Sequence, residues 1–212
     1  MPATSNRKDN PETPARGQGK RARTRQQLVN TAIAMLADNT LESASILDLA
    51  KAAGVSNGTF YNYFQTRDEL VDAAAAQLSE QMAVQLRAEF TGVDDPADRI
   101  VIAARTFMLR ARREPVFGWA LLRLIGTLPR LSERVRQSIL QDVREGKAKG
   151  RFHFGSDAAA ADMVLGTLIV GIRSLLEKRV GEAHIRDIGE VSLRGLGMGA
   201  EEAQAIAARL VP

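Results

Sequence analysis

The chain has 212 residues and no cysteine, which excludes disulfide frameworks and the zinc and iron–sulfur sites that need thiolate ligands. Hydrophobic residues make up 45% and charged residues 25%, as is typical of a globular protein that can bury its own core. No apolar run approaches the roughly 20 residues that cross a bilayer, and no secretory signal is visible. We therefore expect a cytoplasmic protein of one or two domains.

Positive charge is concentrated at the N-terminus. The net charge is +4, of which residues 1–25 carry +5 and the rest of the chain −1. Residues 1–19 are rich in Pro, Asn, Thr and Gly, so ordering them would bury almost no apolar surface, and we predict a disordered basic arm there. Such an arm suits a polyanion, because each neutralised phosphate releases counterions. Charge alone is equally compatible with a solubilising tail.

Three short helices are predicted after the arm. The first covers residues 24–38, where apolar side chains recur every three to four residues. The second begins at Ser45 in an S-x-x-D capping box and ends at Gly54. The third begins at Ser56 and ends near Phe64. Three helices within forty residues form a distinctive pattern.

Longer helices follow. Thr66 and Glu69 form another capping box, which opens a fourth helix that reaches Phe90. Further helices are predicted over residues 96–113, 115–128, 131–149, 156–179, 183–196 and 201–210. No segment alternates with a period of two, so we predict an all-α protein of nine to ten helices.

The motif that bears on function is the segment 45–70, SILDLAKAAGVSNGTFYNYFQTRDEL. A helix, a three-residue turn that starts at Gly54 and a second helix make the helix-turn-helix arrangement, whose second helix enters the major groove of DNA. Phe60 and Phe64 must face the core, which leaves Asn62 and its polar neighbours facing outward, where they can meet base edges. A three-helix bundle with an inert surface is the alternative, and the basic arm disfavours it.

This segment resembles the tetracycline-repressor (TetR) family of transcriptional regulators. The resemblance is strong over residues 24–70 and rests on Ala50, Gly54-Val55-Ser56, Gly58, Phe60-Tyr61, Tyr63-Phe64 and Thr66-Arg67-Asp68-Glu69-Leu70. It implies a homodimer in which residues 20–68 form a helix-turn-helix DNA-binding domain and residues 69–212 form a larger helical domain that binds an effector and dimerises. The implied partners are a near-palindromic operator in double-stranded DNA, a second copy of the chain and a largely apolar small molecule. Neither cofactor, metal nor membrane is implied.

The resemblance also assigns roles to single residues. Tyr61 and Tyr63 match positions that clamp the DNA backbone. Thr59 and Asn62 match base-reading or near-base positions, and Arg67 matches a phosphate-binding cation. The complete predicted DNA-binding set is Lys20, Arg21, Arg23, Arg25, Ser45, Leu47, Ser56, Asn57, Thr59, Tyr61, Asn62, Tyr63 and Arg67.

Leu47 departs from the pattern of the family. Many relatives carry a cation or a polar group at this outward position of the second helix. A leucine there would contact a thymine methyl group or cover sugar carbons instead.

Candidate effector residues lie on the fourth to sixth predicted helices. Arg123 is the only charged residue of the sixth helix, so it needs a partner. An internal ion pair with Glu114 or Asp142 is favoured over an anionic ligand. The predicted effector pocket comprises Leu86, Phe90, Ile102, Arg105, Thr106, Leu109, Phe117, Trp119 and Arg123. Aromatic residues at helical spacing are nevertheless more often plain core.

The eighth predicted helix is the candidate dimer interface. Gly166 and Gly171 omit side chains within an apolar run, at a cost of about 1 kcal/mol each relative to alanine, which close approach of a partner helix would explain. Packing within one subunit is the alternative. The predicted interface comprises Met163, Gly166, Thr167, Val170, Gly171 and Ser174.

Two other classes of function compete with a ligand-responsive repressor. Catalysis is disfavoured, because neither His153 nor His184 has partners at a spacing that suits a triad or a metal site. The glycine-flanked segment 146–150 ends a helix and lacks the Walker pattern. The second competitor is a DNA-binding architectural or partner-controlled factor without an effector. A deep apolar pocket in the C-terminal domain would argue against it.

Overall fold

The computed structural model describes residues 13–211, with side chains for residues 19–129 and 131–211. All regular secondary structure in the described residues is helical, which confirms the all-α prediction. The helices are α1 (Thr13–Ala37), α2 (Ile46–Ala52), α3 (Asn57–Tyr61), α4 (Arg67–Glu89), α5 (Pro96–Arg113), α6 (Pro115–Thr127), α7 (Pro129–Ala148), α8 (Asp157–Leu176), α9 (Ala183–Gly195) and α10 (Ala200–Leu210).

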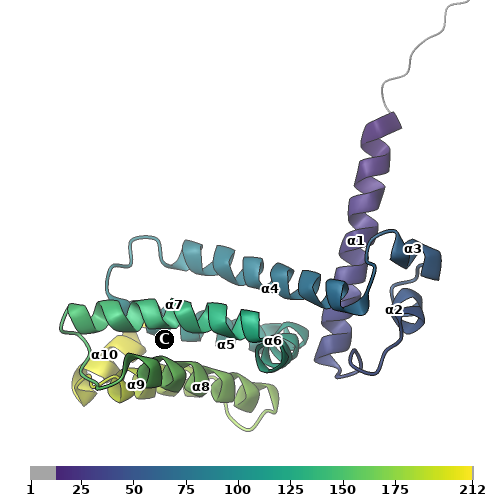
Figure 1. Cartoon of the computed structure of the whole chain (residues 1–212). Helices are drawn as coiled ribbons and strands as arrows, with labels where there is room; N and C mark the ends of the chain where they lie inside the picture. The colour runs from purple at the N-terminus through teal and green to yellow at the C-terminus, as the bar shows by residue number, and fades with distance from the viewer. Residues whose placement is uncertain (1–12, 212) are drawn as a thin grey trace, which may run out of the picture.

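The first three helices and the start of α4 form a small unit at one end of the molecule (Figure 1). Leu28, Leu49, Phe60 and Leu70, one from each of these helices, are completely buried. Their apolar surface joins these elements, of which α2 and α3 are too short to be stable alone. The turn from α2 to α3 passes through Gly54 at φ +65, a left-handed conformation that favours glycine.

The N-terminal part of α1 corrects the prediction of disorder. α1 begins at Thr13, so residues 13–19 are helical, whereas residues 1–12 of the predicted arm lie outside the described residues. Disorder is expected because ordering residues 1–19 would bury almost no apolar surface, but burial is not the only factor that stabilises a helix. Buried Leu28 and Val29 fix the later turns of α1, and a helix elongates from an existing turn far more easily than it nucleates. Within residues 13–19, Ala15, Arg16 and Gln18 are good helix formers and Pro14 suits the first turn of a helix, which offsets the poor propensity of the two glycines.

The larger body is built around α5, which contacts α6, α7, α8, α9 and α10. A Cβ on Gly171 would lie 3.0 Å from Cε of Met108 on α5 and 3.1 Å from Cγ1 of Ile188 on α9. The missing side chain therefore lets α8 approach helices of its own subunit. This corrects the assignment of Gly171 to the dimer interface.

α8 also corrects the statement that no apolar stretch approaches a membrane span. Its length and composition would suffice to cross a bilayer, and it is the only helix of the described residues for which this holds. α8 packs against α5, α7 and α9, and Val164 and Ile172 are buried there. It is placed as a core helix of the larger body.

Two elements join the small unit to the larger body. α4 runs from α3 along the larger body, and α6 packs against α1 (Figure 1). On this α1–α6 contact, Nη1 of Arg123 donates a hydrogen bond to Oδ1 of Asn39 at 2.6 Å. The predicted ion pair of Arg123 with Glu114 or Asp142 is therefore wrong. Those carboxylates accept hydrogen bonds from arginines of α5 that lie nearer to them.

Candidate DNA interface and effector cavity

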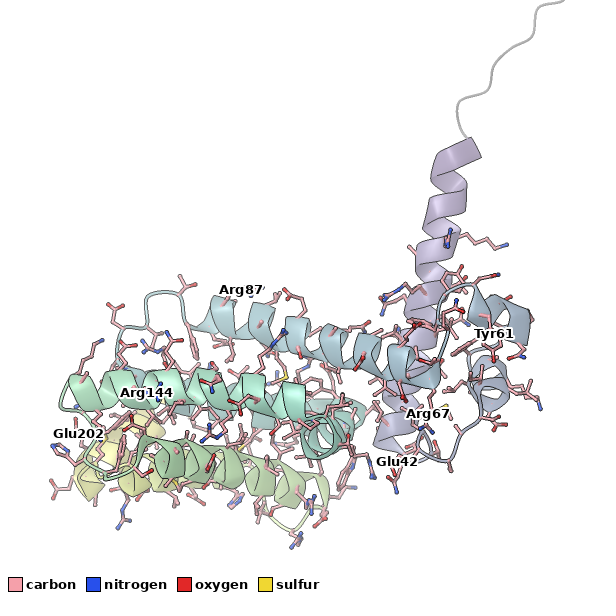
Figure 2. All side chains as sticks on the ribbon, in the orientation of Figure 1. Glu42, Tyr61, Arg67, Arg87, Arg144 and Glu202 are labelled. Carbon is pink, nitrogen blue, oxygen red and sulfur yellow. The ribbon has the colours of Figure 1, made fainter. Side chains whose placement is uncertain are left out.

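The short helix α3 has a buried side and an open side. The rings of Phe60 and Phe64 are buried with their centroids 6.1 Å apart, which fixes the inner side as predicted. Tyr61 is 43% exposed, and Asn62 is exposed as well. Figure 2 shows Tyr61 on α3 at the end of the molecule that is remote from the larger body. The described part of the chain therefore leaves the polar side of α3 uncovered.

Basic residues of α1 lie beside α3. The guanidinium carbon of Arg21 lies 6.0 Å from the ring centroid of Tyr63, and that of Arg25 lies 5.3 Å from the ring centroid of Phe64. These contacts place positive charge next to the candidate recognition helix. Exposed residues of the predicted DNA-binding set are Lys20, Arg21, Arg23, Arg25, Ser45, Leu47, Ser56, Asn57, Tyr61 and Asn62, and half-buried ones are Thr59, Tyr63 and Arg67. We call these thirteen residues the α1–α3 surface.

Two serines of this surface cap helices. The Ser45 hydroxyl accepts a hydrogen bond from the N–H of Asp48 at 3.1 Å, and the Asp48 carboxylate accepts one from the N–H of Ser45 at 3.0 Å. Hydrogen bonds from the side chain and backbone of Ser45 lower the pKa of Asp48. The Ser56 hydroxyl accepts a hydrogen bond from the N–H of Thr59 at 3.1 Å. These caps confirm the predicted starts of both helices and fix their direction.

Arg67 connects the beginning of α4 to the loop before α2. Its Nη1 donates a hydrogen bond to the carbonyl oxygen of Glu42 at 2.6 Å, and both residues are labelled in Figure 2. The Arg67 side chain remains 40% exposed. Its guanidinium can therefore hold this loop and still present further N–H donors to an anion.

A cavity of about 170 Å³ lies between α4, α5 and α7 and extends to α8 and α9. Most of its surface is apolar. The lining residues are Ser79, Met82, Ala83, Leu86, Phe90, Ile100, Ala103, Ala104, Phe107, Leu131, Arg134, Val135, Ser138, Ile139, Asp142, Val164, Leu168 and Ser192. Residues of α4 form one wall of the cavity. A molecule bound in the cavity would therefore contact the helix that connects to α3.

Asp142 is the one carboxylate among the residues that line the cavity. Its Oδ1 accepts a hydrogen bond from Nε of Arg99 at 2.7 Å. Burial raises the pKa of Asp142, and the hydrogen bond and charge of Arg99 oppose this increase without cancelling it. An anchored acceptor in apolar surroundings favours a ligand with a hydrogen-bond donor.

Two of the nine predicted pocket residues, Leu86 and Phe90, line this cavity. The other seven lie elsewhere. Arg105, Thr106 and Leu109 line a separate concavity on another side of α5. The helical rotation of about 100° per residue points their side chains away from the cavity. Ile102 and Phe117 are buried, Trp119 packs against the core, and Arg123 lies on the α1–α6 contact.

The α7 residues of the cavity were missed by sequence reasoning. Leu131, Val135 and Ile139 recur at intervals of four on a helix rich in charged residues, and Asp142 follows one turn later. This apolar stripe identifies the buried face of α7. The stripe does not show that this face borders a cavity, because the cavity depends on how closely α4 packs against α5 and α7.

The candidate dimer surface is an exposed strip on α8 and α9. Val170 on α8 is 62% exposed and Val191 on α9 is 53% exposed, and Gly166 is exposed one turn before Val170. A Cβ on Gly166 would meet no described atom within 4 Å. Met163, Thr167 and Ser174 are half-buried. Five of the six predicted interface residues are therefore at least partly exposed, and Gly171 is buried.

Comparison with known families covers both parts of the chain. The family described as "Bacterial regulatory proteins, tetR family" matches residues 28–74. The family described as "Tetracyclin repressor-like, C-terminal domain" matches residues 95–209, which is more than half of the chain. The chain belongs to the TetR family of DNA-binding transcriptional regulators. TetR proteins are regulators and not enzymes, which agrees with the sequence analysis.

Curated relatives match less than half of the chain. The chain is 28% identical over 92 residues to the uncharacterised HTH-type transcriptional regulator YvdT of Bacillus subtilis (strain 168), covering 43% of this chain and 47% of YvdT. It is 33% identical over 78 residues to the HTH-type transcriptional regulator BetI of Serratia proteamaculans (strain 568), covering 36% of this chain and 39% of BetI. The chain thus spans less than half the length of these relatives.

Solved structures match nearly the whole chain. RolR in complex with resorcinol is 26% identical, with a TM-score of 0.66 over 92% of this chain and 98% of RolR. The fatty acid degradation regulator FadR from Bacillus halodurans is 18% identical, with a TM-score of 0.70 over 81% of this chain and 98% of FadR. The second likeness concerns the TetR fold alone.

Proposed function

We propose that the protein is a homodimeric repressor that a small molecule releases from its operator. The observation that carries this proposal is the course of α4, which starts beside the α1–α3 surface and then forms one wall of the cavity. A ligand that binds best when α4 is displaced shifts the population toward that state. An architectural factor without an effector is disfavoured, because an apolar cavity against α4 is typical of a ligand-binding site and would not be needed in such a factor.

The DNA-binding step places α3 of each subunit in successive major grooves, about 34 Å apart, on a near-palindromic operator. Tyr61, Tyr63 and Arg67 bind backbone phosphates, while Thr59 and Asn62 meet base edges. DNA selected from a random library and fluorescence anisotropy test these roles. Tyr61→Ala is expected to weaken binding to all sequences, whereas Asn62→Ala is expected to change sequence preference. Unchanged affinity in a folded Tyr61→Ala dimer would contradict the assignment.

The cavity fits an effector with one ring. An apolar cavity of about 150 Å³ in another protein holds benzene, and this cavity measures about 170 Å³. Asp142 supplies a hydrogen-bond acceptor, which suits a neutral ligand with a hydroxyl group. The resorcinol bound to RolR is a ligand of this kind. A small phenol is therefore our proposed effector class.

Isothermal titration calorimetry with resorcinol tests this class, with 1,3-dimethoxybenzene as a ligand that cannot donate. Asp142→Asn is expected to weaken resorcinol binding about tenfold, since the acceptor loses its charge and the hydrogen bond becomes a weaker neutral one. Asp98→Asn is the matched control, because Asp98 pairs with Arg209 away from the cavity. Equal affinity of both variants for resorcinol would refute the role of Asp142.

We infer three further properties on the same basis. Two copies of the chain pair through the strip formed by Gly166, Val170 and Val191, which is open and apolar. The DNA-binding part covers residues 20–68 and the effector part residues 69–212, and the division falls in the first turn of α4. Activity on chromosomal DNA implies a cytoplasmic location.

A further inference from the structure

A second concavity, which we call the polar groove, lies on another side of the α4–α5 pair. Its volume is about 480 Å³. At about 100° per residue, the α5 residues that line the polar groove point roughly 140° away from those that line the apolar cavity. The two sites are therefore separate, although both lie against α4 and α5.

The lining of the polar groove carries one net positive charge. Arg105, Arg110 and Arg113 line it from α5, and its carboxylates are Glu89 and Glu114. Nη2 of Arg105 pairs with Glu89 at 2.6 Å, and Nε of Arg110 lies 3.3 Å from Glu114. Arg113 is exposed and forms no ion pair with any residue between 19 and 211 that has a described side chain. Among the described side chains, one guanidinium is thus left without a counter-charge.

The buried hydroxyl group of Thr106 is a hydrogen-bond donor in the lining of the same groove. The residue is 4% exposed and lines the polar groove between the two inner arginines of α5. Its hydroxyl oxygen has no hydrogen-bond partner among the described residues, not even the carbonyl four residues earlier that helical threonines often use. A buried hydroxyl without a partner destabilises the free protein, and a ligand oxygen would satisfy it.

We propose that the polar groove binds a small organic carboxylate. A carboxylate accepts hydrogen bonds from Arg113 and from the Thr106 hydroxyl, and its single charge balances the net charge of the lining. Leu109, which also lines the groove, contacts the apolar part of the ligand. Glu89 competes with the ligand carboxylate for Arg105, because the Arg105 guanidinium already donates a hydrogen bond to Glu89. This site goes beyond the proposed effector function, which depends on the apolar cavity.

Calorimetric titration of the full-length protein with benzoate tests the proposal. Glu89→Gln removes the competing carboxylate and is expected to tighten benzoate binding about tenfold. Arg113→Gln and Thr106→Val each remove one contact and are expected to weaken it about tenfold. Arg87→Gln is the matched control, because Arg87 pairs with Glu80 on the exposed side of α4 and is expected to change nothing.

Thermal denaturation shows whether the variants fold. Thr106→Val is expected to raise the melting temperature of the free protein, since it removes an unpaired hydroxyl while keeping the shape of the side chain. Unchanged benzoate affinity in both Arg113→Gln and Thr106→Val would overturn the proposal.

Two further measurements separate the polar groove from the apolar cavity and from simple anion binding. Ala103→Phe fills the apolar cavity, so benzoate binding that persists in this variant supports the groove, and binding that disappears refutes it. Inorganic phosphate is expected to bind more weakly than benzoate, because it has no apolar part for Leu109. Equal affinity for both anions would overturn the assignment to an organic carboxylate.

Discussion

The most informative perturbation is the removal of positive charge from the part of α1 that lies beside α3. Arg21→Gln combined with Arg25→Gln deletes two cations per subunit, hence four per dimer. Both residues are exposed and both lie against aromatic rings of the small unit. If α1 binds the DNA backbone, these arginines neutralise phosphates and release counterions on binding.

The size of the effect follows from this count. Each phosphate contact contributes about 0.9 to the slope of log affinity against log salt, so four contacts contribute about 3.6. Between about 50 and 200 mM salt, the unsubstituted protein should therefore lose roughly a hundredfold more affinity than the variant. The two cation–π contacts contribute about 0.5–1 kcal/mol each to stability at exposed sites, so melting temperatures should be measured alongside.

Fluorescence anisotropy on selected operator DNA at a series of salt concentrations gives both slopes. The matched control replaces Arg87 and Arg144 by Gln, which removes the same charge from α4 and α7, away from Tyr61 (Figure 2). The control is expected to keep the slope of the unsubstituted protein. Equal slopes for the two double variants would show that α1 acts through net charge alone and would refute its contact with DNA.

Three further substitutions test other parts of the structure. Val170→Glu should convert the dimer to monomers in size-exclusion chromatography with light scattering, because a charge would be buried twice at the symmetric strip; a stable dimer would place the interface elsewhere. Burial would raise the pKa of Asp95, but hydrogen bonds from Arg151 and the backbone lower it. The resulting stabilisation is complete above the ordinary carboxyl pKa and is lost as the pH falls through the lowered pKa of the folded protein. Asp95→Asn, which keeps a helix cap, should therefore cost about 1 kcal/mol in urea denaturation at neutral pH and progressively less as the pH falls below the ordinary carboxyl pKa; an equal loss at neutral and at acidic pH would exclude the ion pair as the cause. Gly146→Ala should lower the free energy of unfolding by about 2 kcal/mol, since the new Cβ would lie 2.1 Å from the buried ring of Phe152; a gain in stability would contradict this packing.

The sequence by itself determined the local features of the DNA-binding part. Ser45, Ser56 and Thr66 cap the helices that their spacing predicts, and Phe60 and Phe64 face inward. These features depend on hydrogen bonds and periodicity within one or two turns, so a short window of sequence contains their cause. The resemblance to the TetR family rests on the same window.

Tertiary structure alone decided the remaining features. Arg123 finds Asn39, which is 84 residues away in the chain, and Gly171 packs against helices of its own subunit. The apolar cavity exists because α4, α5 and α7 leave space between them, which the stripe of each helix does not reveal. Such features depend on the relative placement of distant helices, and that placement is set by the packing of all their side chains at once.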